Sequence, residues 1–369
     1  MSDHTMYGAQ LDAGKTSETL SHLFRNNHEA LEKGRKATPV CIWGTHGIGK
    51  TMLVEEYAKE QGWQFAYVAP AQFEEMGDLN GLPVLEEKED GTKTTNFAPP
   101  DWVPTAEGPG ILLLDDVNRA DDRILRGLMQ LLQNGELFSW ALPDKWQIVC
   151  TANPEGGDYS VTPMDDAMLT RMLHISMVFD EKPWAKWASR NDVDERGIAF
   201  VLTYPESVTG RRTTPRSLTQ FFQQISSIEN LKEEADLVYT LGMSSLDEVT
   251  VSTFMAFVND NLQQLINPED ILNAPDFSVV ARRIEDLSEG GKRMDHLSTI
   301  CTRLHLHLTH PSFKPKEAHR ENLVSFLMHE SLPTDLRVSL HRDLVRDASD
   351  EVRVMMRDRR LAKLMLAGM

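Results

Sequence analysis

The stretch PVCIWGTHGIGKT, residues 39–51, is the most informative part of this sequence about the fold. Residues 39–43 are apolar and fit a buried strand of a parallel sheet. Residues 50–62, KTMLVEEYAKEQG, have the pattern of a helix that ends on a glycine. The glycine-rich residues between them are typical of a phosphate-binding loop, which needs a strand before it and a helix after it. A glycine-rich turn with a chance lysine is the alternative, and the strand and helix argue against it.

Gly44, Gly49, Lys50 and Thr51 hold the fixed positions of the pattern G-x-x-x-x-G-K-[ST]. Glycines let successive backbone N–H groups turn towards an anion, and the N-terminus of the following helix adds partial positive charge. We expect Lys50 to reach the β- and γ-phosphates of a nucleotide and the Thr51 hydroxyl to bind Mg²⁺. The segment expected to contact the nucleotide is Gly44, Thr45, His46, Gly47, Ile48, Gly49, Lys50, Thr51 and Met52.

A second apolar run ends in carboxylates. The segment GILLLDDVNRA, residues 110–120, fits a buried strand followed by Asp115 and Asp116. We expect Asp115 to hold Mg²⁺ directly or through water, because carboxylate oxygens are ligands that Mg²⁺ prefers. Asp116 can orient the attacking water or accept its proton. The alternative is a solvated strand end with no further role.

Three other polar residues are candidates for the same site. Asn153 ends the apolar run QIVCTANP and could hydrogen-bond the attacking water or the γ-phosphate, although Asn before Pro is also a turn signal. Arg171 is either a surface residue or, in a ring, an arginine that reaches the nucleotide of the next subunit. Arg216 follows Pro215 at a helix start, where a cation opposes the helix dipole, so we expect an anionic partner such as the γ-phosphate.

Composition sets the broad class. The chain has 369 residues, a formal net charge of −18, 41% hydrophobic residues and 25% charged residues, as in ordinary globular proteins. The negative charge argues against an extensive nucleic-acid-binding surface. The three cysteines are expected to be buried and reduced. A polar N-terminus and the lack of long apolar runs lead us to expect a cytoplasmic protein.

The order of patterns predicts four regions. We expect a flexible N-terminus at 1–15, an α/β nucleotide-binding domain at 16–181, an α-helical lid at 182–275 and a helical extension at 276–369. The first helix is expected at 16–36, capped by Thr16 or Ser17. The remaining segments expected in the α/β domain are strands in QFAYVAP (64–70), WQIVCTAN (146–153) and MLHISM (172–177), an exposed insertion (86–102) and a hairpin (134–146).

Other features have competing interpretations. His305, His307 and His310 are either ordinary, partly buried histidines or metal ligands, and their spacing favours the former. Trp184 and Trp187 are expected in the lid core, with nucleotide stacking as the alternative. The acidic residues 86–90 are either a solvated loop tip or a partner contact. The amphipathic segments 333–347 and 349–369 pack on the chain itself or dock a partner.

In this order, the motifs resemble those of the AAA+ ATPases, and most of all the MoxR-type branch. GTHGIGKT matches Walker A, LLLDDVNRA Walker B, CTANP sensor 1, DDAMLTRM the arginine-finger segment and TTPRS sensor 2. The resemblance implies a parallel sheet flanked by helices, a helical lid, and a ring, usually a hexamer, with ATP and Mg²⁺ between subunits. It further implies that Asp116 is the catalytic base, that Asn153, Arg171 and Arg216 are sensor 1, finger and sensor 2, and that Arg119 is a second contact across the interface.

One departure from the family pattern bears on activity. The family usually has Glu after the Walker B Asp, where this chain has Asp116. A carboxylate that is one methylene shorter stands back from the attacking water, and such misplacement can cost about 10²-fold in rate.

Three functions are therefore open. The first is a ring ATPase that remodels or assembles a protein client, for which the family resemblance implies a von Willebrand factor A domain protein as a partner. The second is a nucleotide-gated scaffold with incidental hydrolysis. The third, which the acidic balance makes less favourable, is a nucleic-acid motor or loader.

Overall fold

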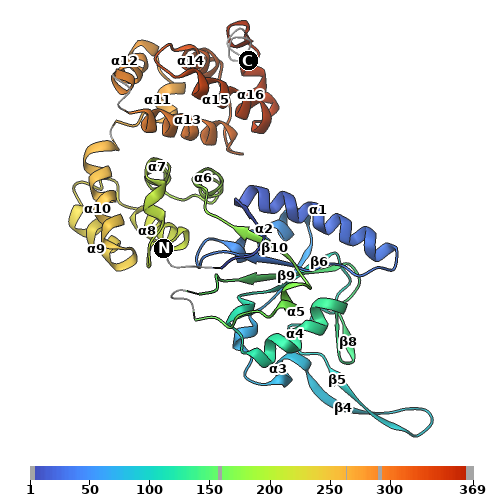
Figure 1. The fold of residues 1–369 in the computed structure, drawn as a ribbon. Coiled ribbons are helices and arrows are strands. Elements are labelled where there is room, and N and C mark those ends of the chain that lie inside the picture. Colours follow the sequence, from blue (N-terminus) through green and yellow to red (C-terminus); the bar gives the residue numbers. More distant parts are fainter. Residues whose placement is uncertain (1–4, 157–159, 263, 290–292, 363–369) are drawn as a thin grey trace. The chain divides into compact units, whose positions relative to one another are not determined.

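The five apolar runs expected as strands, together with an unexpected N-terminal strand β1, form one six-stranded sheet in the order β1-β10-β2-β9-β6-β3. All of its paired strands are parallel. The computed structural model describes residues 5–156, 160–262, 264–289 and 293–362 (Figure 1). The sheet strands are β1 (Ala9–Leu11), β2 (Val40–Trp43), β3 (Gln64–Val68), β6 (Gly110–Leu114), β9 (Trp146–Ala152) and β10 (Leu173–Met177).

The chain divides into two compact units, Met1–Asp180 and Glu181–Met369. The sheet belongs to the first unit and the long series of helices from α6 onward belongs to the second. The further boundary that we expect between a lid and an extension, at 275/276, is not marked by this division and stays a prediction.

Alternating side chains of the central strands face two separate apolar layers. Cys41 and Trp43 of β2 point into one layer, which includes Leu128 of α4 (Asp122–Asn134). Val40 and Ile42 point into the other, which includes residues of α1 (Ala13–Glu32) and α2 (Lys50–Gln61). Figure 1 shows α1 and α2 on one face of the sheet and α4 on the opposite face. This confirms the predicted α/β class with a parallel sheet flanked by helices.

The N-terminal prediction is wrong for the described part of residues 1–15. Ala9–Leu11 form an edge strand that pairs with Ile175–Met177. Asp12 then caps α1, because its side chain accepts a hydrogen bond from the Lys15 N–H at 2.9 Å. The helix therefore starts at Ala13, and the cap is neither Thr16 nor Ser17. Residues 1–4 lie outside the described residues.

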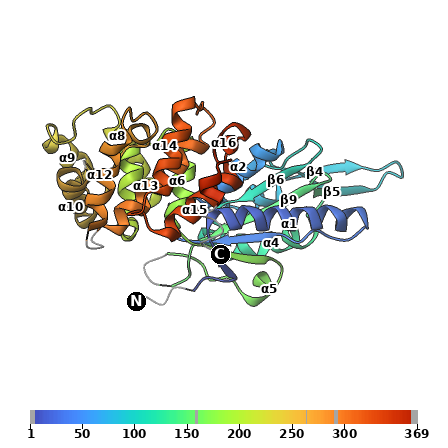
Figure 2. The ribbon, with the colours of Figure 1, turned by 90° about the horizontal axis from the view of Figure 1, so that it is seen from above.

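Two antiparallel hairpins lie outside the parallel sheet in the described part of the first unit. The predicted exposed insertion is confirmed as exposed, and most of it belongs to a pair of antiparallel strands, β4 (Leu82–Glu87) and β5 (Lys93–Ala98). Figure 2 shows this hairpin extending away from the parallel sheet. The hairpin expected at 134–146 is confirmed by β7 (Glu136–Leu137) and β8 (Trp140–Ala141). The shorter helices of this unit are η1 (Pro70–Gln72), α3 (Met76–Asn80), η2 (Val117–Arg119) and α5 (Asp166–Leu169).

The second unit begins with an aromatic core. Phe200 and Phe254 meet edge to face with ring centroids 5.1 Å apart. Trp184 is buried and its ring lies 6.4 Å from that of Phe222, which confirms its predicted place in a core. The helices around this core are α6 (Glu181–Arg190), α7 (Glu195–Thr203), η3 (Pro205–Val208), α8 (Pro215–Ile225), α9 (Ala235–Ser245), α10 (Glu248–Ala256) and the π-helix η4 (Phe257–Asn261).

The C-terminal helices pack on the chain itself. They are α11 (Pro268–Leu272), α12 (Phe277–Ser288), α13 (Met294–Thr309), α14 (Glu317–Met328), α15 (Thr334–Asp347) and α16 (Asp350–Met355). Leu340 and Leu344 of α15 are buried, and α15 lies against α13. Ser349 caps α16 as predicted. The last part of the expected amphipathic segment, 363–369, lies outside the described residues.

In the described part of the chain, no helix is both long and apolar enough to cross a membrane.

Candidate nucleotide-binding site

The predicted phosphate loop lies between the end of β2 and the start of α2. Gly47 has φ 72° and Gly49 has φ 103°, a region that side chains other than glycine rarely adopt. Gly44 approaches β10 so closely that an added Cβ would lie 3.0 Å from the carbonyl oxygen of Met177. Because Gly49 has no side chain to cap the helix, the first N–H groups of α2 remain suited to an anion.

Lys50 is the first residue of α2 and its side chain turns back under the loop. Its Nζ donates to the carbonyl oxygens of Gly44 at 2.8 Å and Thr45 at 3.3 Å, and to Oδ1 of Asn153 at 3.2 Å. The residue is only 6% exposed. A buried ammonium held by carbonyl oxygens inside a glycine-rich loop is well placed to exchange these contacts for phosphate oxygens.

Asp115 connects the loop to the neighbouring strands. Its Oδ1 accepts hydrogen bonds from the hydroxyls of Thr51 and Thr151, both at 2.7 Å, and its Oδ2 accepts one from Tyr67 at 3.2 Å. The two residues predicted to hold Mg²⁺, Thr51 and Asp115, are thus in direct contact. Their oxygens are the hard ligands that Mg²⁺ prefers, so these residues fit the ion.

Asp116 is held in an unusual conformation. It has φ 49°, in the left-handed region, and its N–H donates to Oγ1 of Thr151 at 2.7 Å. Its carboxylate pairs with Arg119, with Nε 3.2 Å from Oδ2. The predicted catalytic base is therefore next to the predicted metal carboxylate, and the arginine predicted to act across a subunit interface contacts it within the same chain.

Asn153 joins the phosphate loop through a fixed backbone. The side-chain amide of Asn118 makes two hydrogen bonds to the backbone of Asn153. Nδ2 of Asn118 donates to the Asn153 carbonyl at 2.7 Å, and Oδ1 of Asn118 accepts from the Asn153 N–H at 3.0 Å. The side-chain Nδ2 of Asn153 is buried and has no hydrogen-bond partner within the described residues. This donor fits an additional acceptor, such as a phosphate oxygen or a water, beside Lys50.

The remaining predicted residues lie outside this cluster. Arg171 contacts Gln133, with Nε 3.2 Å from Oε1, and the carbonyl of Ala167. Arg216 is exposed near the start of α8, in the second unit. Met52 is 46% exposed on α2. Within the first unit, the structure thus brings together Lys50, Thr51, Asp115, Asp116, Asn153 and Arg119.

Sequence reasoning missed three residues that position this cluster: Thr151, Tyr67 and Asn118. The hydroxyl of Thr151 accepts from Asp116 and donates to Asp115, which fixes the direction of its proton. Burial and the neighbouring Asp115 raise the pKa of Tyr67, so its hydroxyl stays protonated and donates. A hydroxyl in the otherwise mostly apolar strand WQIVCTA was a usable signal for Thr151, whereas Tyr67 and Asn118 gave none.

The three histidines discussed above do not form a metal site. His305 lies 3.5 Å from Asp347, His307 packs on Phe313, and His310 contacts Ser312. Among the described residues, no group of three or more His, Cys, Asp or Glu side chains is arranged to hold a metal ion.

Comparisons with known proteins identify the region around the site. Residues 39–172 match the AAA domain family described as the dynein-related subfamily. An ATP-dependent protease ATP-binding subunit-like protein from Rhodococcus erythropolis is 30% identical over 144 residues, which is 35% of this chain. The match spans 37% of that relative, so this chain covers about a third of its length.

Solved structures of RuvB mutants from Thermotoga maritima are also similar. One has 13% identity and a TM-score of 0.40 and covers 94% of this chain and 90% of that chain. Another has 15% identity and a TM-score of 0.39 and covers 72% and 78%. The family match, and not these low-scoring likenesses, identifies the region around the site. Residues 39–172 of this chain are an AAA domain of the dynein-related subfamily.

Proposed function

We propose that this chain binds ATP with Mg²⁺ and hydrolyses it. The observation that carries the proposal is the contact of Thr51 with Asp115 at 2.7 Å, beside the buried Lys50. In the proposed complex, the backbone N–H groups of residues 46–50 and Nζ of Lys50 bind the phosphates, and Thr51 and Asp115 hold the ion. An ion held by Thr51 and Asp115 would supply positive charge next to the phosphate oxygens.

Asp116 is the proposed base, and its contact with Arg119 bears on the rate. Nε of Arg119 lies 3.2 Å from Oδ2 of Asp116, so this carboxylate oxygen is already engaged by a cation. To act as the base, Asp116 has to contact the attacking water through its other oxygen or exchange the contact with Arg119. Asn153 is proposed to hold the attacking water or the γ-phosphate through its buried Nδ2.

The proposed working form is a ring, and a hexamer is the size we favour. In a ring, Arg171 and Arg119 would reach the nucleotide of the neighbouring subunit. Arg216 would contact the γ-phosphate, and the position of the helical unit would then depend on whether that phosphate is present. We propose a MoxR-like, chaperone-like role in which this cycle remodels or assembles a protein client, with a von Willebrand factor A domain protein as the candidate partner. A cytoplasmic location suits the buried, free Cys41, Cys150 and Cys301.

A nucleotide-gated scaffold is the second candidate. Two observations favour it: the short carboxylate of Asp116 and the ion pair that this carboxylate makes with Arg119. In this alternative, ATP binding stabilises the assembly and hydrolysis is incidental.

Steady-state ATP turnover by Asp116 variants separates the two candidates. The enzyme proposal predicts that Asp116→Glu raises turnover, because the longer side chain reaches further, and that Asp116→Asn lowers it by about 10²-fold or more. Asp116→Asn should leave assembly intact while blocking release of a client. Equal, background-level turnover in all three proteins would favour the scaffold. A salt-sensitive rise in turnover on adding single-stranded DNA would instead favour a nucleic-acid motor.

A further inference from the structure

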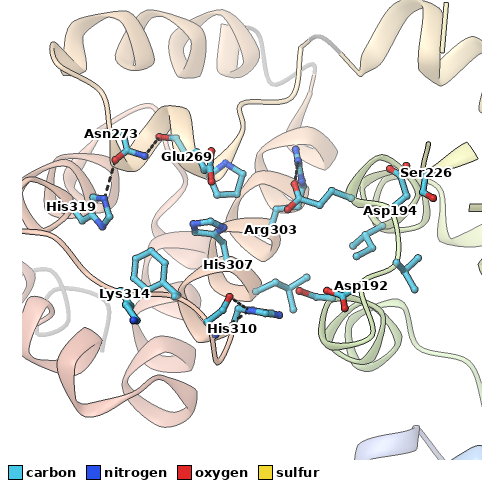
Figure 3. Close-up of a pocket in the computed structure, with 18 of the residues that line it drawn as sticks. Asp192, Asp194, Ser226, Glu269, Asn273, Arg303, His307, His310, Lys314 and His319 are labelled. Carbon is cyan, nitrogen blue, oxygen red and sulfur yellow. Dashed lines mark hydrogen bonds and ion pairs between the residues drawn. The ribbon is translucent and has the colours of Figure 1, made fainter. Parts of the chain in front are cut away.

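A second candidate binding site lies entirely within the helical unit. It is a cavity of about 710 Å³, within the usual size range of small-molecule sites. Its walls come from the turn between α6 and α7, the start of α11, the C-terminal half of α13 and the segment that leads into α14. Figure 3 shows Arg303 and His307 of α13 in the middle, His319 on one side and Asp192 and Asp194 on the other.

Arg303 is buried in this cavity wall with unused donors. The residue is 7% exposed, and its Nη2 lies 3.0 Å from Oδ1 of Asn267 and 3.5 Å from Oε2 of Glu195. Its Nη1 is buried and has no hydrogen-bond partner within the described part of the chain. Burying a guanidinium nitrogen without a hydrogen-bond acceptor costs free energy of folding. The presence of such a nitrogen here therefore indicates an acceptor that the protein itself does not supply.

The acidic residues of the wall do not supply this acceptor. Asp194 caps α7 through the Arg196 N–H at 2.8 Å and also binds the Arg196 guanidinium. Glu195 has a side chain that is 74% exposed, and its Oε2 lies 3.5 Å from Nη2, while Nη1 has no hydrogen-bond partner among the described residues. The charge of Arg303 is therefore only partly balanced from within the wall.

The histidines of the wall differ in what they can still bind. His319 uses both ring nitrogens, because Nδ1 accepts from the Lys316 N–H at 3.2 Å and Nε2 lies 3.0 Å from Oδ1 of Asn273. His307 packs its ring on Phe313 at 5.2 Å, and its ring nitrogens make no hydrogen bond among the described residues. His307 follows Arg303 by one helical turn, so both donors lie on one face of α13.

We propose that this cavity binds a small molecule through an oxyanion group, a carboxylate or a phosphate, that accepts from Nη1 of Arg303 and from the ring of His307. Such a ligand would connect the α6–α7 turn to α11 and α13. The proposal is independent of the nucleotide site, since the two sites share no residue.

Calorimetric titration of the full chain tests the proposal with inorganic phosphate and with citrate as separate probes. Lys50→Ala serves as the parent protein, because the phosphate loop would otherwise bind phosphate as well. Arg303→Met, which keeps length and apolar packing, should weaken binding by about tenfold or more, as expected for loss of a hydrogen bond to a charged group. Arg342→Met is the matched control, since Arg342 lies exposed on α15 outside the cavity, and it should bind like the parent.

The titrations have results that support the proposal and results that overturn it. Binding of phosphate alone or of citrate alone, lost in Arg303→Met, supports the proposal and identifies the oxyanion. The proposal is overturned if neither probe binds the parent, or if Arg303→Met binds as the parent does. Should Arg303→Met fail to fold, His307→Gln replaces it, and unchanged affinity in that variant would overturn the proposal too.

Discussion

At the scale of single residues, the site depends on hydroxyl groups that orient one carboxylate. Thr51, Thr151 and Tyr67 all donate to Asp115, so both of its oxygens are fixed before any ligand binds. Groups that orient a metal-binding carboxylate typically affect metal affinity by about 10- to 100-fold. Thr151 also binds the N–H of Asp116, which couples the metal carboxylate to the proposed base.

Tyr67→Phe tests this orientation with little effect on packing. The variant removes the hydroxyl 3.2 Å from Oδ2 of Asp115 and keeps the ring. We expect it to raise the Mg²⁺ concentration needed for half-maximal nucleotide binding by about tenfold. Tyr239→Phe is the matched control, because Tyr239 is 45% exposed against 47% for Tyr67 and lies on α9. An identical Mg²⁺ requirement in both variants would show that Tyr67 does not orient the carboxylate.

At the scale of elements, the start of α2 needs glycine at position 49 for its backbone conformation and not for space. Gly49 precedes α2 with φ 103°, and Gly62 follows the same helix with φ 66°; an added Cβ at either position would meet nothing within 4 Å. Replacing either residue with alanine should therefore cost stability only through the strained backbone, by about 1–2 kcal/mol.

Gly49→Ala and Gly62→Ala thus form a matched pair for one helix. Both should lower the free energy of unfolding by a similar amount in denaturant titrations. Only Gly49→Ala should also weaken nucleotide binding, because it changes the direction of N–H groups at the helix start. Equal nucleotide affinity in the two variants would argue against an anion at this helix end.

The docking of α15 has a predictable pH dependence. The hydrogen bond from Arg346, at 2.7 Å, and the nearby Lys186 lower the pKa of Asp347 from 3.8 to about 2. Because the folded pKa is the lower one, this carboxylate stabilises the fold above pH 3.8 and loses its contribution as the pH falls towards about 2.

Asp347→Asn should lower the free energy of unfolding at neutral pH by about 1 kcal/mol, after allowance for its partly exposed partners. The difference from wild type should shrink as the pH is lowered from 3.8 to about 2. Asp335→Asn, an exposed change at the start of the same helix, is the control. A difference that does not vary with pH would contradict the assigned cause.

At the scale of the whole molecule, the sequence predicted those strands and site residues that depend on patterns of neighbouring residues. The buried strands β2 and β6 are continuous apolar runs and β9 is mostly apolar, so these strands and the polar residues at their ends were located correctly. The edge strand Ala9–Leu11 is too short to show a pattern, and its pairing with Ile175–Met177 depends on a segment distant in sequence. The roles of Tyr67 and Asn118 were missed for the same reason, since each contacts a residue on another strand or loop. Thr151 differs, because its hydroxyl in a mostly apolar strand was a signal that was not used.

The proposed ring makes a prediction about mixed subunits. Lys50→Ala should abolish nucleotide binding in its own subunit, and Arg171→Ala should abolish hydrolysis in the neighbouring one. Mixing the two inactive variants should restore ATP turnover, because some interfaces then combine an intact loop with an intact Arg171. Mixing Lys50→Ala with the double variant should restore none. Absence of recovery in the first mixture would show that Arg171 does not act between subunits.

Calorimetric titration with ATP in the presence and absence of Mg²⁺ tests the central proposal most directly. We predict Mg²⁺-dependent binding by the wild-type chain, loss of binding in Lys50→Ala, and loss of the Mg²⁺ dependence in Asp115→Asn. If the wild-type chain takes up no ATP, or if Asp115→Asn keeps its full Mg²⁺ dependence, then the contact between Thr51 and Asp115 is not a nucleotide–metal site.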